Sequence, residues 1–201
     1  MKKLIIIMAL LIAAPAMAGD FKIKVESMQY IPVDANLVLR QEIPTITLDW
    51  KFKDPFSFFI SAEKNSLRMY GQRCMSIDIY GVGGAFEKKV WDILTLSASA
   101  GVYVPQWTEG HSAAEGIYLT LRGKVGENPP GFDKYWVDPE FWTLGLNLGA
   151  SVNVWKNLDV SAGMRFLPIH YNLRGSKGDV SWTWDSTLDA GGWFVGFNYR
   201  F

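Results

Sequence analysis

The chain ends in Gly191-Gly192-Trp193-Phe194-Val195-Gly196-Phe197-Asn198-Tyr199-Arg200-Phe201, and this stretch decides how the rest of the sequence is interpreted. Every second residue from Trp193 to Phe201 is aromatic or aliphatic, whereas the residues between them are mostly small or polar. Alternation with a period of two is typical of a β-strand with two unlike faces. A strand that crosses a bilayer needs about 9–11 residues with its apolar side toward the lipid, and this stretch is long enough.

The same stretch resembles the closing strand of bacterial outer-membrane β-barrels, which typically ends in Phe. Its last three residues, Tyr199-Arg200-Phe201, are similar to the ending of the small OmpX/Ail-type barrels. The pattern of the mature chain resembles the OmpA-transmembrane/OmpX/OmpW group, without a diagnostic internal motif. The resemblance implies a signal read by the barrel-assembly machinery, carried by Trp193, Phe197, Tyr199 and Phe201.

The beginning of the chain predicts export. A basic Met1-Lys2-Lys3 precedes an apolar run from Leu4 to Ala14, and Ala16 and Ala18 form a small-x-small cleavage site. This is the pattern of a signal peptide over residues 1–18, which leaves a barrel domain over residues 19–201. The whole chain has 20 basic and 20 acidic residues, and the signal peptide removes two lysines. The resulting net charge near −2 argues against a nucleic-acid partner.

The composition predicts a membrane protein that crosses with strands. No apolar run after residue 18 is long enough for a spanning helix, yet 49% of the chain is hydrophobic, with nine Trp and twelve Phe. Backbone polar groups inside a bilayer have to be paired, so a chain without spanning helices has to close into a barrel. Cys74 is the only cysteine, so an intramolecular disulfide is excluded. Its default interpretation is a buried or rim thiol, with intermolecular pairing as the alternative.

Alternation along the chain predicts an all-β, antiparallel, up-and-down transmembrane barrel. The eight expected strands are 21–30, 45–53, 56–63, 75–86, 93–104, 141–154, 158–166 and 191–201. Three connections are short, and four are long: 31–44, 64–74, 105–140 and 168–190. Short and long connections alternate, as periplasmic turns and outer loops do in outer-membrane barrels, which places both termini in the periplasm.

Two other architectures compete with this prediction. A ten-strand barrel would use 117–125 and part of 169–188 as further crossings. A soluble barrel of the lipocalin type would turn its apolar face inward. The long aliphatic and aromatic face lies opposite Gly, Ser, Thr and Asn, which favours a narrow lumen and a lipid exterior.

The polar face of the strands predicts a plugged lumen rather than a water-filled pore. Eight strands leave room only for side chains or one small ligand, and buried charges have to be paired. Lys22, Lys24 and Arg200 are expected in water at the rims. The charges expected inside the lumen are Asp49, Lys51, Glu63, Asp78, Asp159 and Arg165.

Sequence evidence for chemistry is weak. His111 and His170 lie near Ser and acidic residues, which allows a hydrolase or acyltransferase to be imagined at the outer rim. The Asp-x-His dyad of the omptin proteases is missing, because Glu109 and Pro168 stand two residues before the histidines. Gly81-Val82-Gly83-Gly84 indicates close strand packing rather than a nucleotide site. We therefore expect no catalytic, metal or cofactor residues and no enzyme.

Aromatic residues in the long segments predict either a recognition surface or packing within each loop. They are Trp107, Tyr135, Trp136, Trp182 and Trp184. The resemblance implies envelope stability, surface adhesion, complement resistance or passage of small hydrophobic molecules. We expect a monomer in the outer membrane, in contact with its lipid and lipopolysaccharide, with a structural or surface-interaction role. The alternatives are transport of a small hydrophobic compound and, third, a lipid-modifying enzyme that uses His111 or His170.

Overall fold

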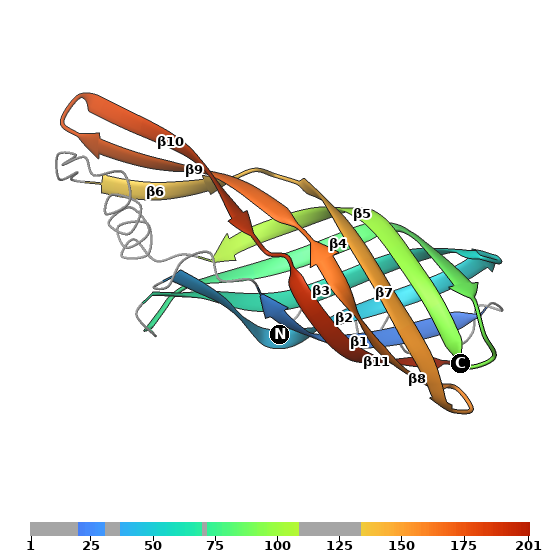
Figure 1. Cartoon of the computed structure of the whole chain (residues 1–201). Helices are drawn as coiled ribbons and strands as arrows, with labels where there is room; N and C mark the ends of the chain where they lie inside the picture. Colours follow the sequence, from blue (N-terminus) through green and yellow to red (C-terminus); the bar gives the residue numbers. More distant parts are fainter. Residues whose placement is uncertain (1–19, 31–36, 70–71, 109–133) are drawn as a thin grey trace.

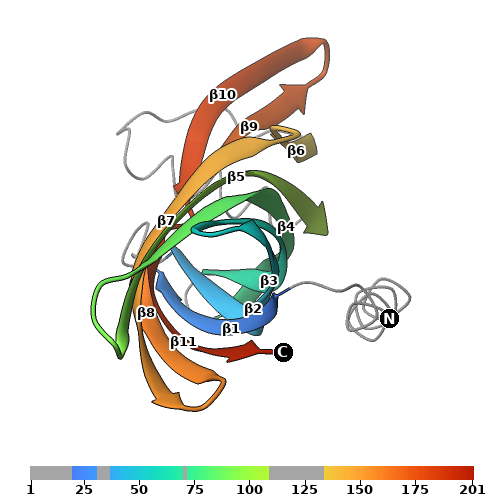
Figure 2. The same ribbon diagram turned by 90° about the vertical axis from the view of Figure 1, so that its right-hand side faces the viewer.

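A closed eight-stranded antiparallel barrel forms the body of the molecule in a computed structural model, which describes residues 20–30, 37–69, 72–108 and 134–201 (Figures 1 and 2). The barrel order is β1-β11-β8-β7-β5-β4-β3-β2, and β1 pairs with β11 to close the wall. No helix within the described residues is long and apolar enough to cross a membrane. The barrel strands are β1 (Phe21–Tyr30), β2 (Leu37–Lys53), β3 (Phe56–Met69), β4 (Gln72–Lys89), β5 (Leu94–Thr108), β7 (Thr143–Trp155), β8 (Leu158–Phe166) and β11 (Gly192–Arg200).

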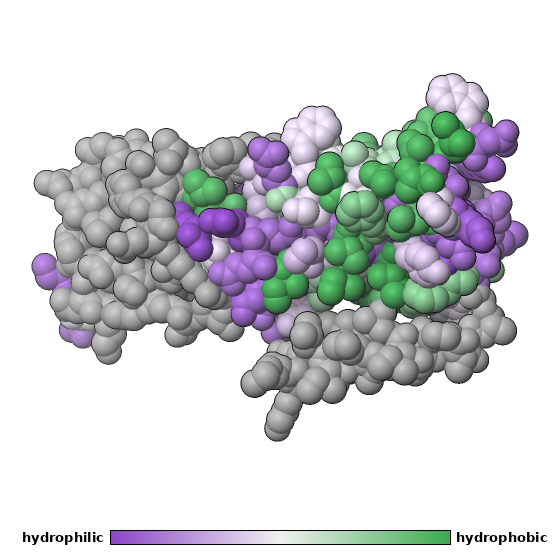
Figure 3. All heavy atoms as spheres, turned by 90° about the horizontal axis from the view of Figure 1, so that it is seen from below, coloured by the Kyte–Doolittle hydropathy of each residue, from purple (hydrophilic) through white to green (hydrophobic). Residues whose placement is uncertain are grey.

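The apolar faces of the strands point outward. In β11 the side chain of Trp193 is 59% exposed, whereas that of the next residue, Phe194, is 6% exposed. The same alternation on the other strands gathers hydrophobic side chains on the barrel wall, with hydrophilic residues to either side along the barrel axis (Figure 3). An exposed apolar belt of this extent is stable in lipid rather than in water. The prediction of a lipid exterior is confirmed, and the soluble-barrel alternative is wrong.

A three-stranded sheet projects beyond one end of the barrel (Figure 1). Its order is β10-β9-β6, formed by β9 (Pro168–Lys177), β10 (Val180–Asp189) and β6 (Lys134–Pro139). The β9–β10 hairpin continues the barrel strands β8 and β11 and turns at Gly178, whose φ of 57° suits glycine. The predicted loop at 168–190 is therefore wrong. The ten-strand barrel is also wrong, because this hairpin belongs to a separate sheet.

Two other predicted loops are largely strand. Strand β2 begins at Leu37 rather than at residue 45, and only two residues separate the end of β3 from the start of β4. The register of β2 against β3 shifts between Gln41 and Ile46, around Pro44, which has no N–H to donate. This irregularity interrupts the alternation of apolar and polar residues in β2, so residues 37–44 did not show the sequence pattern of a strand. The strict alternation of short and long connections is consequently wrong at the β3–β4 connection.

The two ends of the barrel differ in their connections. The end that carries the β6–β9–β10 sheet is called the sheet end below. The opposite end, called the turn end, has the short connections 54–55, 90–93 and 156–157, together with the start of β1 and the end of β11. The N-terminal strand and the C-terminal strand therefore both reach the turn end, as an even strand count requires.

Aromatic rings packed over glycines fill the middle of the barrel. A Cβ atom built at each of these glycines would come within 2.4–3.0 Å of the ring of the partner aromatic residue. Glycine therefore makes room for a large ring inside a narrow barrel, as in aromatic rescue of sheet glycines. The interpretation of the 81–84 glycines as close packing is confirmed for Gly81 and Gly83. The three sets are Phe59 over Gly83 and Gly101, Tyr103 over Gly81 and Gly145, and Phe194 over Gly149 and Gly163.

An apolar cluster fills the lumen at the sheet end. It combines inward side chains of β2, β3 and β4 with the inner face of the β9–β10 hairpin, and Trp107 packs against it. Several of its members have no exposed surface at all. The cluster joins the projecting sheet firmly to the barrel. It contains Leu39, Leu67, Met75, Ile77, Ile79, Leu167, Ile169, Tyr171 and Leu188.

Candidate functional site

A buried ion pair crosses the lumen below the apolar cluster. Arg165 on β8 reaches Glu63 on β3 in a bidentate arrangement, with 2.6 Å between Nη1 and Oε2 and 2.8 Å between Nη2 and Oε1. The two side chains are 4% and 2% exposed. Arg165 also donates from Nε and Nη2 to the carbonyl oxygen of Ala190, at 3.2 and 3.0 Å. The pair thus ties opposite walls of the barrel to each other and to the segment before β11.

Two neighbouring side chains donate to the Glu63 carboxylate, and a third holds one of them in place. The hydroxyl of Thr45 donates to Oε2, and Asn65 Nδ2 donates to Oε1 at 3.0 Å. The hydroxyl of Tyr30 donates to Asn65 Oδ1 at 2.6 Å. Burial of a charge is tolerated when its partners satisfy it in this way. Arg165, Glu63, Tyr30, Thr45 and Asn65 are called the central network below.

A second charged group lies at the turn end of the lumen. Lys24 Nζ is 2.6 Å from Asp49 Oδ2 and 3.0 Å from Glu87 Oε1, and Lys22 pairs with the same Glu87. These four residues are called the mouth cluster. The side chains of Lys22 and Glu87 are 11% and 23% exposed, so water reaches this group. Ion pairs therefore lie in the lumen at two levels, in the central network and in the mouth cluster.

The space between the two charged groups is small. A cavity of 40 Å³ is lined by Lys24 and Glu26 on one side and by Arg165, Tyr103 and Phe194 on the other. One water needs about 10–15 Å³ of such space, whereas ligand pockets run to about 300 Å³ or more. The described lumen accommodates a few waters and is closed to a solute of drug size.

Four of the predicted lumen charges lie inside the barrel: Asp49, Glu63, Asp159 and Arg165. Asp159 is paired near the turn end, at 2.6 Å from Arg200 Nη2 and 2.8 Å from Asn153 Nδ2. The structure thus brings each of these three inner carboxylates to a cation on another strand.

Two predicted lumen charges lie elsewhere. Lys51 is at the rim, where its side chain is 42% exposed and pairs with Asp54 at 2.7 Å, because β2 ends at the turn beside it. Asp78 lies on the outer face of β4, because the flanking Ile77 and Ile79 occupy the inner one. The glycines of β4 had made it difficult to distinguish its inner face from its outer face in the sequence.

Sequence reasoning missed the mouth cluster. Lys22 and Lys24 were expected in water, but they lie inside the lumen against Glu87, which the sequence prediction assigned to a turn. Extending the period of two from Ile77 along β4 assigns Glu87 to the inner face. That signal was present in the sequence.

The predicted recognition aromatics belong to strands. Trp107 lies near the end of β5 and packs against Tyr171, with 5.5 Å between ring centroids, so it is not an exposed loop residue. The backbone places Tyr135 and Trp136 in β6, and Trp182 and Trp184 in β10. The side chains of these last four lie outside the described part of the structure.

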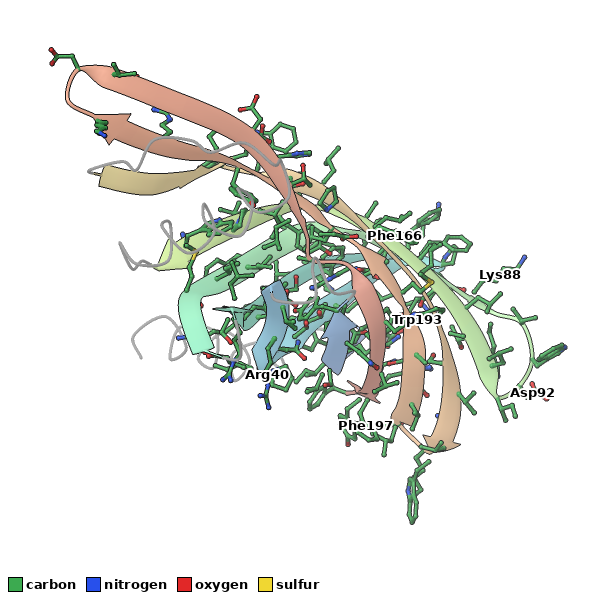
Figure 4. The ribbon with its side chains drawn as sticks, turned by 60° about the vertical axis from the view of Figure 1, so that its left-hand side comes forward. Arg40, Lys88, Asp92, Phe166, Trp193 and Phe197 are labelled. Carbon is green, nitrogen blue, oxygen red and sulfur yellow. The ribbon has the colours of Figure 1, made fainter. Side chains whose placement is uncertain are left out.

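The predicted assembly residues line the outer face of the closing strand and its end. Trp193, Phe197, Tyr199 and Phe201 are all exposed there, and Trp193 and Phe197 are labelled in Figure 4. The predicted cleavage residues Ala16 and Ala18 lie outside the described residues. So does the side chain of Cys74, whose backbone is part of β4.

The histidines give little support for catalysis. His170 Nδ1 lies 2.9 Å from the Thr187 hydroxyl on an exposed face of the hairpin, and His111 lies outside the described residues. Within the described ranges, no group of three or more His, Cys, Asp or Glu side chains is arranged to hold a metal ion.

Comparison with known proteins gives structural likenesses only. No protein-family model matches the sequence, and no curated protein matches it. The outer-membrane protein AlkL, solved in lipid bilayers, superposes with a TM-score of 0.50 at 10% identity, over 91% of this chain and 90% of that one. At this identity the likeness concerns the fold.

Two further barrels give lower scores. The outer membrane protein W of E. coli has a TM-score of 0.48 at 10% identity, over 92% of this chain and 98% of that one. The Yersinia pestis outer membrane protein Ail has 0.45 at 12% identity, over 91% and 99%.

Proposed function

We propose that this small outer-membrane β-barrel is a non-enzymatic surface-interaction protein that contacts its partner through the β6–β9–β10 sheet. In this proposal both termini lie in the periplasm, so the sheet end faces outward. The observation that carries the proposal is the sheet itself, which projects well beyond the end of the barrel (Figure 1). The barrel then serves as its anchor.

The edge of the sheet supports a binding role. Strand β10 pairs with β9 and has no other partner among the described strands. An unpaired edge offers backbone N–H and C=O groups to an extended peptide from another protein. Its exposed side chains are mainly polar, as with Thr183, Asp185 and Thr187, which keeps the projecting edge compatible with water.

The interior of the barrel supports an anchor rather than a pore. The central network and the apolar cluster occupy the lumen at successive levels, and the cavity beside them measures 40 Å³. An eight-stranded barrel filled in this way leaves no room for hydrated solutes. A role outside the membrane then explains best why β9 and β10 are each ten residues long.

Lipid and lipopolysaccharide are further proposed partners. Arg40, labelled in Figure 4, is exposed on β2 toward the sheet end, and Lys64 lies nearby on β3. Cations at that level of an outer-membrane barrel suit the phosphates of lipopolysaccharide. The barrel-assembly machinery is the proposed partner of the closing strand during insertion.

Shortening the hairpin tests the surface role. Residues 173–184 are replaced by Asn-Gly, which joins the paired positions Asn172 and Asp185 by a two-residue turn. Gram-negative cells that express either form are tested for adhesion to an epithelial monolayer and to immobilised collagen, laminin and fibronectin. Wild-type cells should adhere above the empty-vector level, and shortened-hairpin cells should not. A gel shift on heating shows that the shortened barrel has assembled; equal adhesion by the two forms contradicts the proposal.

A second candidate function, lateral passage of a small hydrophobic compound, rests on a seam in the wall. The β1–β2 ladder ends at the pair Glu26 and Thr45, although β1 continues to Tyr30. The Gln41 side chain on β2 bridges this gap: its Oε1 accepts from the Met28 amide of β1 at 2.7 Å, and its Nε2 donates to the Glu26 carbonyl oxygen of β1 at 3.4 Å. The Gln41 side-chain amide thus joins the two strands beyond the last ladder pair, close to the apolar cluster.

Uptake of octane by whole cells tests the second candidate. Cells with the wild-type protein should take up labelled octane faster than cells without it, and Gln41→Ala should increase the difference because the bridging amide is lost. Equal uptake with and without the protein rules out lateral passage of this solute.

A further inference from the structure

A hollow lies on the lipid-facing wall of the barrel, on the side formed by β3, β4, β5 and β7. Its volume is 520 Å³, and its surface is almost entirely apolar. Phe56 and Phe58 of β3 stand on one side and Leu146 of β7 on the other. The floor consists of small residues of the two strands between them: Gly84, Ala98 and Ala100.

The register of the strands explains the shape of the hollow. Phe58, Gly84, Ala100 and Leu146 form one row across four strands, with large residues at its ends and small ones between them. The next row toward the sheet end, Ile60, Val82, Val102 and Leu144, is filled by branched side chains and closes the hollow there. Toward the turn end the next row is Phe56, Phe86, Ala98 and Leu148, so the floor continues only on β5, at Ala98, and the Phe86 ring forms its wall on β4. The hollow is therefore a trough that narrows toward the turn end.

Packing inside the barrel does not require glycine at position 84. A Cβ atom at Gly83 would lie 2.2 Å from a backbone oxygen, so that neighbouring glycine is needed for close approach. A Cβ atom at Gly84 would have its nearest contact at 3.9 Å, with the carbonyl oxygen of Ser57. The missing side chain at Gly84 leaves space on the outer wall and nowhere else.

Lysines stand where the trough approaches the turn end. Lys88 follows Phe86 on the outer face of β4, and it points away from the wall near the turn that carries Asp92 (Figure 4). Lys53 is paired in register with Phe56, which lines the trough, and both lysines are exposed. An apolar trough with cations at one end is complementary to an acyl chain joined to an anionic head group.

We propose that this trough holds one anionic phospholipid of the periplasmic leaflet. An acyl chain lies over Gly84, Ala98 and Ala100, and the phosphate lies beside Lys53 and Lys88. The volume is in the range of about 300–1,000 Å³ that is usual for ligand sites. This site depends on the orientation proposed above, with the turn end in the periplasm, but not on any role of the projecting sheet.

Native mass spectrometry of the full chain tests the site. The protein is purified from outer membranes, delipidated in mild detergent, and titrated with dioleoyl-phosphatidylglycerol or dioleoyl-phosphatidylcholine. Ala100→Leu fills the trough, and Ala150→Leu is the matched control, because Ala150 is a small outward residue of β7 that does not line the trough. Lys88→Gln removes a cation, with Lys156→Gln at another turn as its control.

The wild type should bind one phosphatidylglycerol in preference to phosphatidylcholine. Ala100→Leu should weaken that binding about tenfold or more, since an added side chain displaces the acyl chain. Lys88→Gln should weaken it about fivefold, as expected for one basic residue at an anionic lipid surface. Both controls should bind as the wild type does. Unchanged binding by Ala100→Leu, equal loss in Ala150→Leu, or a wild-type dimer that Ala100→Leu separates would each overturn the proposal; heat-shift gels verify that every variant is assembled.

Discussion

The central network and the mouth cluster use the same kinds of side chain but differ in their access to water. Arg165 and Glu63 are 4% and 2% exposed, whereas Lys22 and Glu87 are 11% and 23% exposed. In the interior, a charge that loses its partner has no other source of hydrogen bonds. At the mouth, Glu87 is partly exposed to water and Lys24 has a second carboxylate partner in Asp49, so the loss of one partner costs less. Closure of the lumen therefore depends most on the central network, and the expected effect of a mutation decreases from that network to the rim.

The largest effect is expected from Glu63→Ala. This change leaves the buried Arg165 guanidinium without its carboxylate and should lower the free energy of unfolding by about 3–5 kcal/mol. Urea unfolding in phospholipid vesicles, followed by Trp fluorescence and by the gel shift, measures the loss. The double variant Glu63→Leu with Arg165→Met should recover most of it, because no unpaired charge remains; a double variant as unstable as Glu63→Ala contradicts the account.

A loss of about 3 kcal/mol is expected from Phe194→Ala, which removes the ring packed over Gly149 and Gly163. The ring lies between the two charged groups, so its removal enlarges the cavity but leaves the central network intact. The same unfolding assay measures the stability, and conductance should stay at the wild-type level. A gain of stable conductance in this variant alone means that the aromatic layer, not the central network, closes the lumen.

A smaller loss, about 1 kcal/mol, is expected from Glu87→Gln in the mouth cluster. Lys24 keeps Asp49 at 2.6 Å, and water reaches Lys22. The loss should shrink further in 1 M salt, because screening shortens to about 3 Å. The comparison fails if this variant costs as much as Glu63→Ala.

The smallest effect is expected at the rim. Lys51→Gln removes an ion pair with Asp54 between two well-exposed side chains, and the stability should change by less than about 0.5 kcal/mol. The unfolding midpoint should coincide with that of the wild type. A loss above that of Glu87→Gln would show that Lys51 belongs to the plug, as the sequence had predicted.

The membrane-facing part of the fold was predictable because the bilayer imposes a strong pattern. Strands such as β11 and β7 need an apolar outer face, and their period of two gave both the strand count and the side that faces lipid. The β9–β10 hairpin was not predicted because a strand that projects into water does not need an apolar outer face. Its exposed positions, such as Thr183, Asp185 and Thr187, resemble those of a polar loop.

The candidate site was harder to predict, because it depends on which strands face each other across the lumen. Arg165 and Glu63 were each assigned to the lumen, but they are 102 residues apart, and only the closed register brings them together. The error at Asp78 has a local cause. Glycines on both faces of β4 weaken the contrast between its inner and outer sides. The sequence therefore did not show which residues of β4 face the lumen.

Single-channel recording in planar bilayers tests the central claim, a barrel closed by its buried ion pair, most directly. The account predicts no stable large conductance for the wild-type chain, because the central network and the apolar cluster occupy the lumen at successive levels. A stable, large conductance step from the heat-shift-verified wild-type barrel would contradict it, and the function would then have to be sought in passage through the barrel rather than at its surface.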